Sequence, residues 1–446
     1  MKKLFGTDGI RGVVNEFLTP EIAFKCGRAL GVKNQYAKVV IAKDTRISGD
    51  MLMLSLISGL ISQGVSVDVL GLSSTPALAQ ITKDNYDFGI MITASHNPYF
   101  YNGIKIFDKT GNKLSDREET DLESVIEKIN DYNYVAVDNI GNINYREDLL
   151  EKYISFIKDK LDKDFYDLKV CIDVANGGAV EIVNKVFDKN KFKKLSFINS
   201  SIDGKNINKN CGATNLEMLK NYVVAKKYDI GFAFDGDADR IMIVDKNGNE
   251  IDGDDILYLL LNSKMQISKN TVVGTVMTNF GLENFLKQKD VVLKRVGVGD
   301  KYIKECMVKN DFSLGGESSG HVITNENCTG DAVYVATKII SILSDTKKSI
   351  DELLSNFEKY PNKLVNIKVD DNLKEQIMNS VFIKDIIEKY QKVFNNNGRI
   401  LIRASGTEPL IRVLVEGRFK KDVDFVVNGL CCEMQKYIEK IVWKYI

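Results

Sequence analysis

The sequence predicts an α/β protein of three related units followed by a small α+β domain. Apolar runs of strand length that end in turn residues alternate with amphipathic runs of helix length, which is the pattern of α/β architecture. With 446 residues the chain is too long for one core, and a prior of roughly 150 residues per domain indicates three or four domains. Three segments of the chain repeat the same order of elements.

Each segment begins with an apolar strand, a loop and a helix, and a second apolar strand follows. The first strands are VVIAKDTR from Val39, VCIDVANGG from Val170 and VVGTVMTNFG from Val272. The helices are MLMLSLISGLISQG, AVEIVNKVFDK and LENFLKQK, and the second strands are VDVLGL, LSFINS and VVLKRV. This order predicts one open α/β sheet in each segment.

A third strand in each segment ends in a polar loop. These strands are DFGIMITAS from Asp87, DIGFAFDGD from Asp229 and DFSLGGESS from Asp311. Aligned on the aspartate, the sixth following positions are Thr93, Asp235 and Glu317, and the eighth are Ser95, Asp237 and Ser319. Because ligands bind beyond the carboxyl ends of strands in open α/β sheets, three such loops around one cleft would face one substrate. A chance alignment is the alternative.

The last 80 or so residues break this pattern. An amphipathic helix, LKEQIMNSVFIKDIIEKYQKVF, precedes the strand GRILIRAS, the turn GTEP, the strand LIRVLVEG and a terminal helix. We interpret these elements as a small α+β domain of about 80 residues. The predicted domains are therefore residues 1–150, 151–253, 254–365 and 366–446.

The composition excludes several classes of protein. The 61 basic residues balance 61 acidic ones, so no net charge attracts the chain to nucleic acid or to a membrane. Seven cysteines with no Cys-x-x-Cys pair, and only two histidines, argue against a zinc site and a disulfide framework. The start MKKLFGTDGIRG lacks the apolar run of a signal peptide, and no run of about 18 apolar residues could span a bilayer. We expect a cytoplasmic protein.

The stretch FDGDADR, residues 234–240, predicts a metal site. Its three aspartates, at alternate positions of a glycine-containing loop after an apolar strand, could direct three carboxylates at one hard cation. An EF-hand is excluded because Arg240 and Lys246 stand where it needs glycine and glutamate. A phosphatase that uses Asp235 as its nucleophile stays open. A solvated acidic turn also stays open, although three carboxylates repel one another without a counter-ion.

The stretch ITASHNP, residues 92–98, suggests that the protein itself carries a phosphoryl group. The chain has no Walker loop, and GVGD at residues 297–300 lacks the spacing of a dinucleotide fingerprint. Ser95 as a phosphoserine dianion would complete the ligands of the three aspartates. Consecutive side chains point in different directions on a helix or strand, so we expect His96 to be badly placed to deprotonate Ser95.

Four other stretches have candidate roles. RASGTEPLIR, residues 403–412, combines arginines, hydroxyls and a glycine turn that suit a phosphate monoester, with a plain hairpin turn as the alternative. GGESSGH, residues 315–321, offers a carboxylate and hydroxyls for sugar hydroxyls. FGTDGIRG, residues 5–12, is a glycine-rich loop or a flexible start. Lys105 in GIK is a lysine that returns to the cleft or an ordinary surface lysine.

Five of these motifs carry a resemblance. GTDGIRG, TASHNP, DGDADR, GGESSGH and RASGTEPLIR resemble the hallmark loops of the α-D-phosphohexomutase family, in the same order and over the whole chain. The resemblance implies three related mixed-sheet α/β domains around a central cleft and a C-terminal α+β domain similar to the TATA-box-binding-protein fold. DGKNINKNCGATN, RVGVGDKYI and CTGDAVYVAT resemble the glucosamine branch, whereas Ala238 and Ser318 depart from residues frequent in the family.

The resemblance also implies a role for each matching residue. Ser95 would be the phosphoserine, and the metal would bind Asp235, Asp237, Asp239 and the Ser95 phosphate. Arg11, Lys105 and Arg240 would line the reacting phosphate, and His96 would shape the loop or touch the phosphoryl group. The predicted substrate contacts are Arg240, Glu317, Ser319, His321, Arg403, Ser405, Gly406, Thr407 and Arg412. Lys105 beside Arg11 is a weak candidate for a base with a lowered pKa.

The implied activity is the interconversion of glucosamine 6-phosphate and glucosamine 1-phosphate through glucosamine 1,6-bisphosphate, feeding UDP-N-acetylglucosamine and cell-wall precursor synthesis. The implied cofactors are one Mg²⁺, phosphoserine at Ser95 and a hexose bisphosphate activator. The implied partners are sugar phosphates, a second copy of the chain, and a kinase unless Ser95 is autophosphorylated. The alternatives are glucose or mannose phosphates as substrates, a metal-dependent phosphatase, and a sugar-phosphate-binding sensor.

Overall fold

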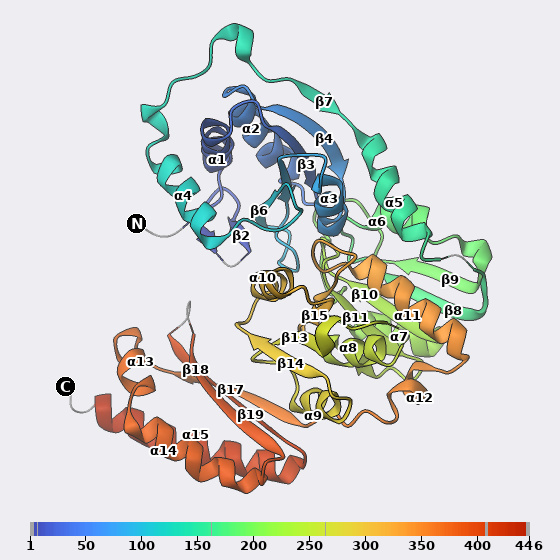
Figure 1. Cartoon of the computed structure of the whole chain (residues 1–446), viewed down its shortest axis with the longest axis vertical. Helices are drawn as coiled ribbons and strands as arrows, with labels where there is room; N and C mark the ends of the chain where they lie inside the picture. The colour runs from blue at the N-terminus through green and yellow to red at the C-terminus, as the bar shows by residue number, and fades with distance from the viewer. Residues whose placement is uncertain (1–3, 7, 162, 264, 406–408, 443–446) are drawn as a thin grey trace. The chain divides into compact units, whose positions relative to one another are not determined.

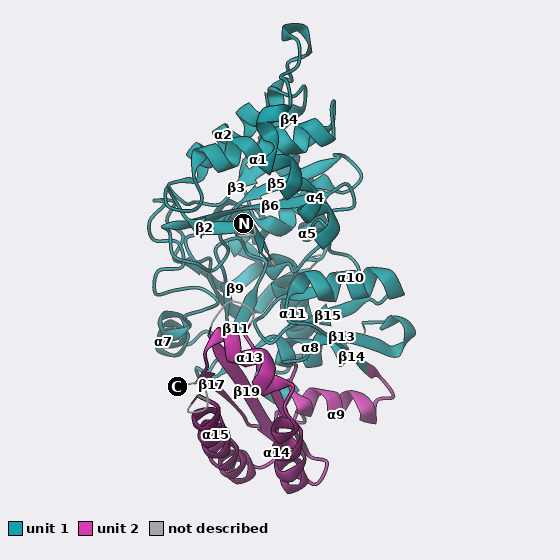
Figure 2. Cartoon of the chain, turned by 90° about the vertical axis from the view of Figure 1, so that its left-hand side faces the viewer, with its two compact units in different colours: residues 1–277, 293–354 teal, residues 278–292, 355–446 magenta. Residues whose placement is uncertain are grey.

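The computed structural model describes residues 4–6, 8–161, 163–263, 265–405 and 409–442. The chain divides into two compact units (Figure 2). The first comprises residues 1–277 and 293–354, and the second comprises residues 278–292 and 355–446. The predicted limits of the four domains stay a prediction.

The first sheet of the first unit has seven strands in the order β1-β2-β6-β5-β3-β4-β7 (Figure 1). The parallel strands are β3, β4, β5 and β7, and β6 returns antiparallel to β5 and pairs with β2 on its other side. The strand bounds are Phe5–Gly6 (β1), Gly9–Val13 (β2), Lys38–Lys43 (β3), Ser66–Leu72 (β4), Phe88–Ile92 (β5), Tyr101–Asp108 (β6) and Ile143–Tyr145 (β7). The glycine-rich N-terminal motif is therefore partly strand and not a flexible start.

Alternate residues of these strands build the core. Val39, Ile41, Ile90 and Ile92 belong to a buried cluster with residues of α1, α2 and α4. Because successive side chains of a strand point to opposite faces, these three helices cover one face of the sheet. The helix bounds are Pro20–Lys33 (α1), Gly49–Ile61 (α2), Thr75–Thr82 (α3) and Asp116–Glu127 (α4). Helix α3 packs against β3 and β5 without contributing to this cluster.

Two further sheets repeat the central strands of the first. Their orders are β12-β11-β10-β8-β9 and β14-β13-β15-β16, so β6-β5-β3-β4, β11-β10-β8-β9 and β16-β15-β13-β14 are equivalent. The strand bounds are Phe165–Asp173 (β8), Phe192–Ile198 (β9), Ile230–Phe234 (β10), Ile241–Asp245 (β11), Glu250–Ile251 (β12), Thr271–Thr275 (β13), Val292–Val296 (β14), Leu314–Gly316 (β15) and Val322–Thr324 (β16). This repeat confirms the predicted three related α/β segments.

The fourth strand of each of the three repeated α/β segments was missed by the sequence interpretation. It runs antiparallel to the third strand, so each polar loop connects two arms of a hairpin. The remaining helices of the first unit are Leu150–Lys158 (α5), Val180–Val186 (α6), Glu217–Lys226 (α7), Gly253–Leu261 (α8), Asp300–Asn310 (α10), Ala332–Thr346 (α11) and Ile350–Leu354 (α12). Short 3₁₀ turns lie at 129–131, 137–139, 147–149, 189–191 and 268–270.

The second unit is an antiparallel sheet in the order β17-β19-β18 with helices packed against it. The bounds are Phe280–Gln288 (α9), Asn362–Lys368 (β17), Asp371–Met378 (α13), Val381–Gln391 (α14), Gly398–Ala404 (β18), Leu410–Gly417 (β19) and Lys420–Val442 (α15), with a 3₁₀ turn at Lys392–Phe394. The single amphipathic helix expected before β18 is two helices. Ser380 breaks it, because its hydroxyl caps α14 by accepting from the Ile383 amide.

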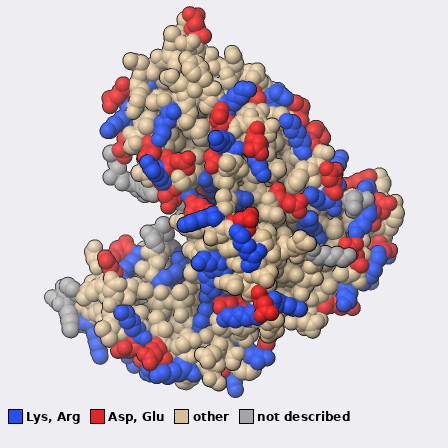
Figure 3. All heavy atoms as spheres, in the orientation of Figure 1, with Lys and Arg blue, Asp and Glu red and all other residues tan. Residues whose placement is uncertain are grey.

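Basic and acidic side chains are interspersed over the face shown in Figure 3, in line with the zero net charge. The seven cysteines are free thiols. Within the described ranges, no helix combines the length and the apolar character that a bilayer crossing requires.

Candidate active site

The three aspartates of the FDGDADR loop form a buried cluster in the first unit. The preceding strand β10 is buried along all five residues, so the loop begins at the core. Asp235, Asp237 and Asp239 are at most 3% exposed, and one carboxylate oxygen of each lies within 4.8 Å of the others. Ala238 turns the loop with φ +57°, a left-handed conformation that costs an alanine about 1 kcal/mol relative to glycine.

Two neighbouring side chains donate hydrogen bonds to the Oδ2 atoms of Asp237 and Asp239. The Thr75 hydroxyl donates to Asp237 Oδ2 at 2.5 Å, and the Lys105 ammonium donates to the same oxygen at 2.8 Å. The ammonium also donates to Asp239 Oδ2 at 3.1 Å. Burial opposes the charge of Asp239, but the nearby cations led by Lys105 outweigh it and hold the pKa of Asp239 well below its usual range.

The Oδ1 atoms of two aspartates in the cluster are suited to bind a cation. Asp237 Oδ1 and Asp239 Oδ1 are buried and accept no hydrogen bond from the described residues. Burial and the two neighbouring carboxylates raise the pKa of Asp235 well above its usual range, which is the response of like charges without a counter-ion. A hard cation that prefers oxygen ligands would bind both Oδ1 atoms and remove this repulsion.

Ser95 lies against this cluster. Its hydroxyl donates to Asp235 Oδ2 at 2.6 Å, and the side chain is 1% exposed. Ser95 follows β5 in a left-handed conformation with φ +51°. The loops approach so closely that a Cβ on Gly236 would lie 2.6 Å from the Ser95 carbonyl oxygen. Glycine is therefore required at position 236.

His96 is closer to Ser95 than the sequence predicted. Its Nδ1 lies 3.3 Å from Ser95 Oγ, because the left-handed turn at Ser95 brings the two consecutive side chains together. The expectation that they diverge is wrong. Burial and the charges of Arg240 and Arg11 lower the pKa of His96 to about 4. His96 is thus neutral near pH 7, and the Ser95 proton points to Asp235.

Lys105 is buried beside the cluster and is not a surface lysine. It lies on β6, opposite Met91 of β5, and is 1% exposed. Its ammonium is 3.2 Å from Asp8 Oδ2 as well as near the two aspartates already described. Burial disfavours its charge, but Asp237, Asp239 and Asp8 outweigh burial and hold the pKa of Lys105 well above its usual range. The suggested base with a lowered pKa is therefore wrong in this arrangement.

Arg11 and Arg240 add positive charge around Ser95. Arg11 lies on β2, opposite Gly103 of β6, and pairs with Asp8. The Arg240 amide donates to Asp235 Oδ1 at 3.2 Å, and its guanidinium is 3.9 Å from Asp239 Oδ1. Burial opposes the Arg240 charge, yet the surrounding carboxylates raise its pKa. The site therefore combines a carboxylate cluster with three fixed cations.

The GGESSGH loop lies next to the aspartate loop. Its Gly320 carbonyl accepts from the Ile241 amide at the start of β11 at 3.0 Å. Ser319 donates to Glu317 Oε2 at 3.3 Å, and the Gly299 amide donates to Glu317 Oε1 at 2.9 Å. A carboxylate and a hydroxyl are thus held near Arg240.

His321 ends this loop between two carboxylates. Its Nδ1 is 3.7 Å from Asp239 Oδ1, and its Nε2 is 3.5 Å from Asp300 Oδ2. Burial disfavours the charged ring, but Asp300 and Asp239 outweigh burial and raise its pKa. In the neutral ring, Nε2 can instead accept from the Gly330 amide, which lies 3.0 Å away.

The predicted phosphate-binding residues belong to the second unit. Arg403 of β18 and Arg412 of β19 are cross-strand partners, and Ser405 is buried at the end of β18. Burial and the charge of Arg412 lower the pKa of Arg403. Two arginines that repel each other on adjacent strands favour an anion between them. Gly406 and Thr407 lie outside the described residues.

Several residues at the site were not predicted as site residues. Asp8 pairs with Lys105 and Lys113, and Lys113 also bonds Asp300 Oδ2 at 2.5 Å. Thr75 follows a second strand, and the sequence interpretation considered only the loops after first and third strands. Lys113 and Asp300 had no distinguishing pattern, because they meet only where the segment after β6 contacts the first residue of α10.

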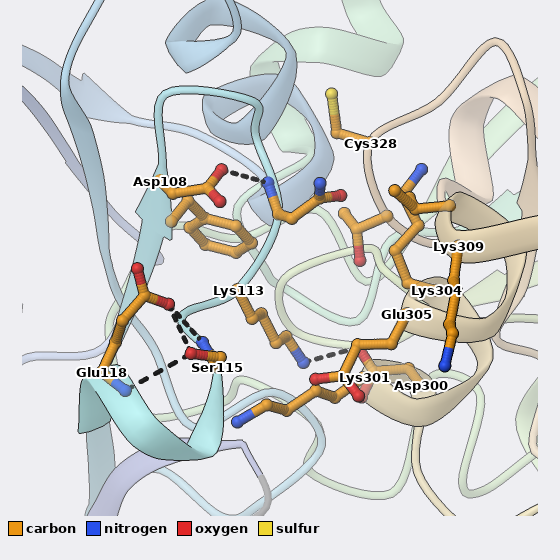
Figure 4. A pocket seen from close by; sticks show the side chains of 14 residues that line it. Asp108, Lys113, Ser115, Glu118, Asp300, Lys301, Lys304, Glu305, Lys309 and Cys328 are labelled. Carbon is orange, nitrogen blue, oxygen red and sulfur yellow. Dashed lines mark hydrogen bonds and ion pairs between the residues drawn. The ribbon is translucent and has the colours of Figure 1, made fainter. Parts of the chain in front are cut away.

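Lys113 and Asp300 also line a cavity of about 370 Å³ in the first unit (Figure 4). The other walls are the segment after β6, helix α10 and the Cys328 segment. Its charged lining residues are four lysines and four carboxylates: Lys113, Lys301, Lys304, Lys309, Asp108, Glu118, Asp300 and Glu305. The lysines and carboxylates are equal in number, so the lining has no excess of positive charge.

Comparison with known proteins identifies the family. Models of phosphoglucomutase/phosphomannomutase α/β/α domains I, II and III match residues 2–133, 145–248 and 252–360, and the model of the C-terminal domain matches residues 364–427. The chain belongs to the phosphoglucomutase/phosphomannomutase family. The predicted fold class, with three α/β domains of mixed sheets and a C-terminal domain, is confirmed, and so is the predicted enzyme class of mutase.

Similar proteins within this family cover nearly the whole chain. A phosphoglucosamine mutase of Ruminiclostridium cellulolyticum is 43% identical over 96% of this chain and 97% of its own. One of Clostridioides difficile is 42% identical over 98% and 99%. A phosphoglucomutase/phosphomannomutase family protein of Burkholderia thailandensis has the same fold, with a TM-score of 0.82 and 23% identity over 98% of both chains.

A more distant structure is described with ligands. It is an Aspergillus fumigatus N-acetylphosphoglucosamine mutase in complex with GlcNAc-6P and magnesium. The two folds match with a TM-score of 0.64 at 16% identity, over 98% of this chain and 95% of that one.

Proposed function

We propose that the chain interconverts glucosamine 6-phosphate and glucosamine 1-phosphate with Ser95 as the phosphoryl carrier. The observation that carries the proposal is the Ser95 hydroxyl, which lies 2.6 Å from Asp235 in a cluster of three carboxylates with Lys105 on the other side. The relatives that are over 40% identical along the chain are phosphoglucosamine mutases, which supports glucosamine phosphates as substrates.

In the proposed reaction, the phosphoryl group moves from Ser95 to the substrate and back. O1 of glucosamine 6-phosphate attacks phosphorus, the O1–P bond forms, the bond from phosphorus to Ser95 Oγ breaks, and O1 gives its proton to a base of the site. The 1,6-bisphosphate turns over, Oγ attacks its 6-phosphorus, the O6–P bond breaks, and O6 takes up a proton, which leaves glucosamine 1-phosphate and a phosphorylated Ser95. A loose transition state places charge on the peripheral oxygens, which Arg11, Lys105 and Arg240 would stabilise.

Other residues of the site would bind and orient the sugar. Glu317 would accept hydrogen bonds from sugar hydroxyls, and Ser319 would accept from or donate to them. Arg403 and Arg412 would hold the phosphate that does not react. His321, held between Asp239 and Asp300, is the group that we propose to exchange a proton with the sugar. His96 would contact the phosphoryl group as a neutral ring.

We propose Mg²⁺ as the cation of the aspartate cluster. Asp235, Asp237 and Asp239 would hold it together with a Ser95 phosphate oxygen, and it would neutralise charge on the transferring group. We also propose that a hexose 1,6-bisphosphate rephosphorylates Ser95, that a kinase or autophosphorylation first loads it, and that the chain forms a homodimer through its first domain.

Phosphopeptide mass spectrometry on freshly purified protein tests the carrier directly. We expect the peptide that contains Ser95 to carry about 80 Da, the mass of one phosphoryl group, on a fraction of the molecules. Incubation with glucose 1,6-bisphosphate should raise that fraction. A peptide that stays unmodified while the protein catalyses the reaction would contradict the carrier role.

The substrate preference is tested by kcat/KM for the 6-phosphates of glucosamine, glucose and mannose. We expect glucosamine 6-phosphate to exceed the other two by about 10-fold or more, which corresponds to one additional charged or hydrogen-bonded contact of about 1.4 kcal/mol in the transition state. Equal values would favour a general hexose mutase. Release of inorganic phosphate with no isomerisation would instead favour a phosphatase.

A further inference from the structure

Arg46 lies behind the Ser95 loop and has no role in the proposed reaction. It belongs to the KDTR turn after β3, and β3 pairs in parallel with β5, the strand that leads into Ser95. The turn and the loop therefore leave neighbouring strand ends. Arg46 is 1% exposed, and its side chain pairs with Asp44 at 2.9 Å, with both side chains fully buried.

All five N–H groups of the Arg46 side chain donate hydrogen bonds. Nε donates to Asp44 Oδ2 at 2.9 Å. The other four donors reach backbone carbonyls of the loop at 2.5, 3.0, 2.9 and 2.8 Å, and their acceptors are Pro98, Tyr101, Ser95 and Asn97. One planar group thus holds four backbone carbonyls between Ser95 and Tyr101, where the loop joins β6.

The loop needs such support because its conformation is strained. Ser95 has φ +51°, which an L-residue other than glycine adopts at a cost of about 1 kcal/mol or more. The Ser95 amide donates to the Thr93 hydroxyl at 3.0 Å, and that hydroxyl donates to Asp44 Oδ2 at 2.7 Å. Asp44, Arg46 and Thr93 therefore form one hydrogen-bonded network that holds the backbone of the loop.

A second group donates to two of the same carbonyls. The Asn208 amide donates to Ser95 O at 2.8 Å and to Asn97 O at 3.1 Å. Asn208 lies in the segment after β9 of the second α/β sheet, the sheet that also carries the aspartates. The carbonyl of the proposed carrier residue is therefore fixed from both sheets, whose loops meet at the reaction centre.

We propose that Arg46 is a positioning residue for phosphoryl transfer, and that Asn208 assists it. The inference rests on the proposed role of Ser95. Arg46 acts through the backbone, since none of its hydrogen bonds in the described structure reaches Ser95 Oγ. A lysine would keep the charge and the pair with Asp44, but one ammonium cannot supply four donors in a plane to separate carbonyls. The planar guanidinium of Arg46 therefore fixes the backbone of the loop, and with it the direction of Ser95 Oγ.

The test compares Arg46→Lys with Arg28→Lys, the same change at another buried arginine. Arg28 is 4% exposed, donates to a backbone carbonyl, Tyr132 O, at 2.8 Å, and lies on α1 away from the site. We expect Arg46→Lys to lower kcat by about 100-fold with KM for glucosamine 6-phosphate changed less than about threefold, because misplacing a reacting group by about 1 Å costs that much. Arg28→Lys should leave kcat within about twofold.

A second readout follows the rate at which glucose 1,6-bisphosphate phosphorylates Ser95, measured by intact mass. This rate should fall in Arg46→Lys by a factor similar to kcat and stay unchanged in Arg28→Lys. Asn208→Gly deletes only the amide side chain at a position with φ +58°, which glycine adopts freely, and should lower kcat by about 10-fold.

Two results would overturn the inference. One is an Arg46→Lys protein that unfolds at the temperature of Arg28→Lys and keeps kcat within twofold of the unchanged protein. The other applies if Arg46→Lys does not fold: an unchanged kcat in Asn208→Gly then overturns the inference, and a lowered kcat supports the inference. An unchanged protein without mutase activity, or without phosphate on Ser95, would reject the proposed function first and the Arg46 role with it.

Discussion

Ser95→Ala should abolish turnover and leave the fold intact. The change removes the oxygen that we propose to carry the phosphoryl group, so we expect kcat to fall by about 10⁴-fold or more. The fold loses the hydrogen bond from Ser95 Oγ to Asp235 and the 3.3 Å contact with His96, and should lose about 1–2 kcal/mol of unfolding free energy. A coupled assay of glucosamine 1-phosphate formation and a thermal unfolding curve measure the two effects.

Ser73→Ala is the matched control. Ser73 is equally buried in the same domain, and its hydroxyl has no hydrogen-bond partner among the described residues. Its removal should therefore leave both rate and stability near their original values. A Ser95→Ala protein that keeps a near-normal rate would reject the phosphoserine mechanism and favour direct attack by another group, such as Asp235.

Removal of divalent cations with EDTA should lower the rate by about 10³-fold or more. Without a cation, three buried carboxylates face one another, and the Lys105 ammonium is engaged by Asp237 and Asp239 instead of phosphate. Excess MgCl₂ should restore the rate. Calcium, which takes more ligands at longer distances, should restore it poorly.

Two variants extend this test. In Asp237→Asn, one carboxylate of the cluster becomes neutral, so we expect the rate to fall and half-maximal activation to need more Mg²⁺. Asp245→Asn changes a carboxylate of the same domain that is also buried, at 2% exposed, but is the last residue of β11. It should keep the original Mg²⁺ requirement. Full activity in metal-free buffer would contradict the metal site.

The sequence predicted the features that depend on short stretches of chain. The three repeated strands, their polar loops and the aspartate cluster all lie within nine residues of a strand start, so a local pattern contains them. The break at Ser380 is also local, but a capping serine inside a long amphipathic pattern is a weak signal.

Features that depend on distant partners were missed or predicted wrongly. Lys105 has a raised pKa and not a lowered one, because Asp237 and Asp239, from a loop more than 130 residues away, and Asp8 surround it. His96 contacts Ser95 because of a single positive φ that no pattern of residues shows. Thr75, Asp300 and Arg46 reach the site only when the sheets are assembled.

The antiparallel return strand has a consequence for how this site could diverge. Each loop is closed by two hydrogen-bonded arms, β5–β6, β10–β11 or β15–β16, so its residues can be exchanged without shifting the register of a sheet. Three copies of one scaffold can then specialise separately. In the roles that we propose, one loop presents the hydroxyl that carries the phosphoryl group, another the carboxylates for the cation, and the third the contacts to the sugar.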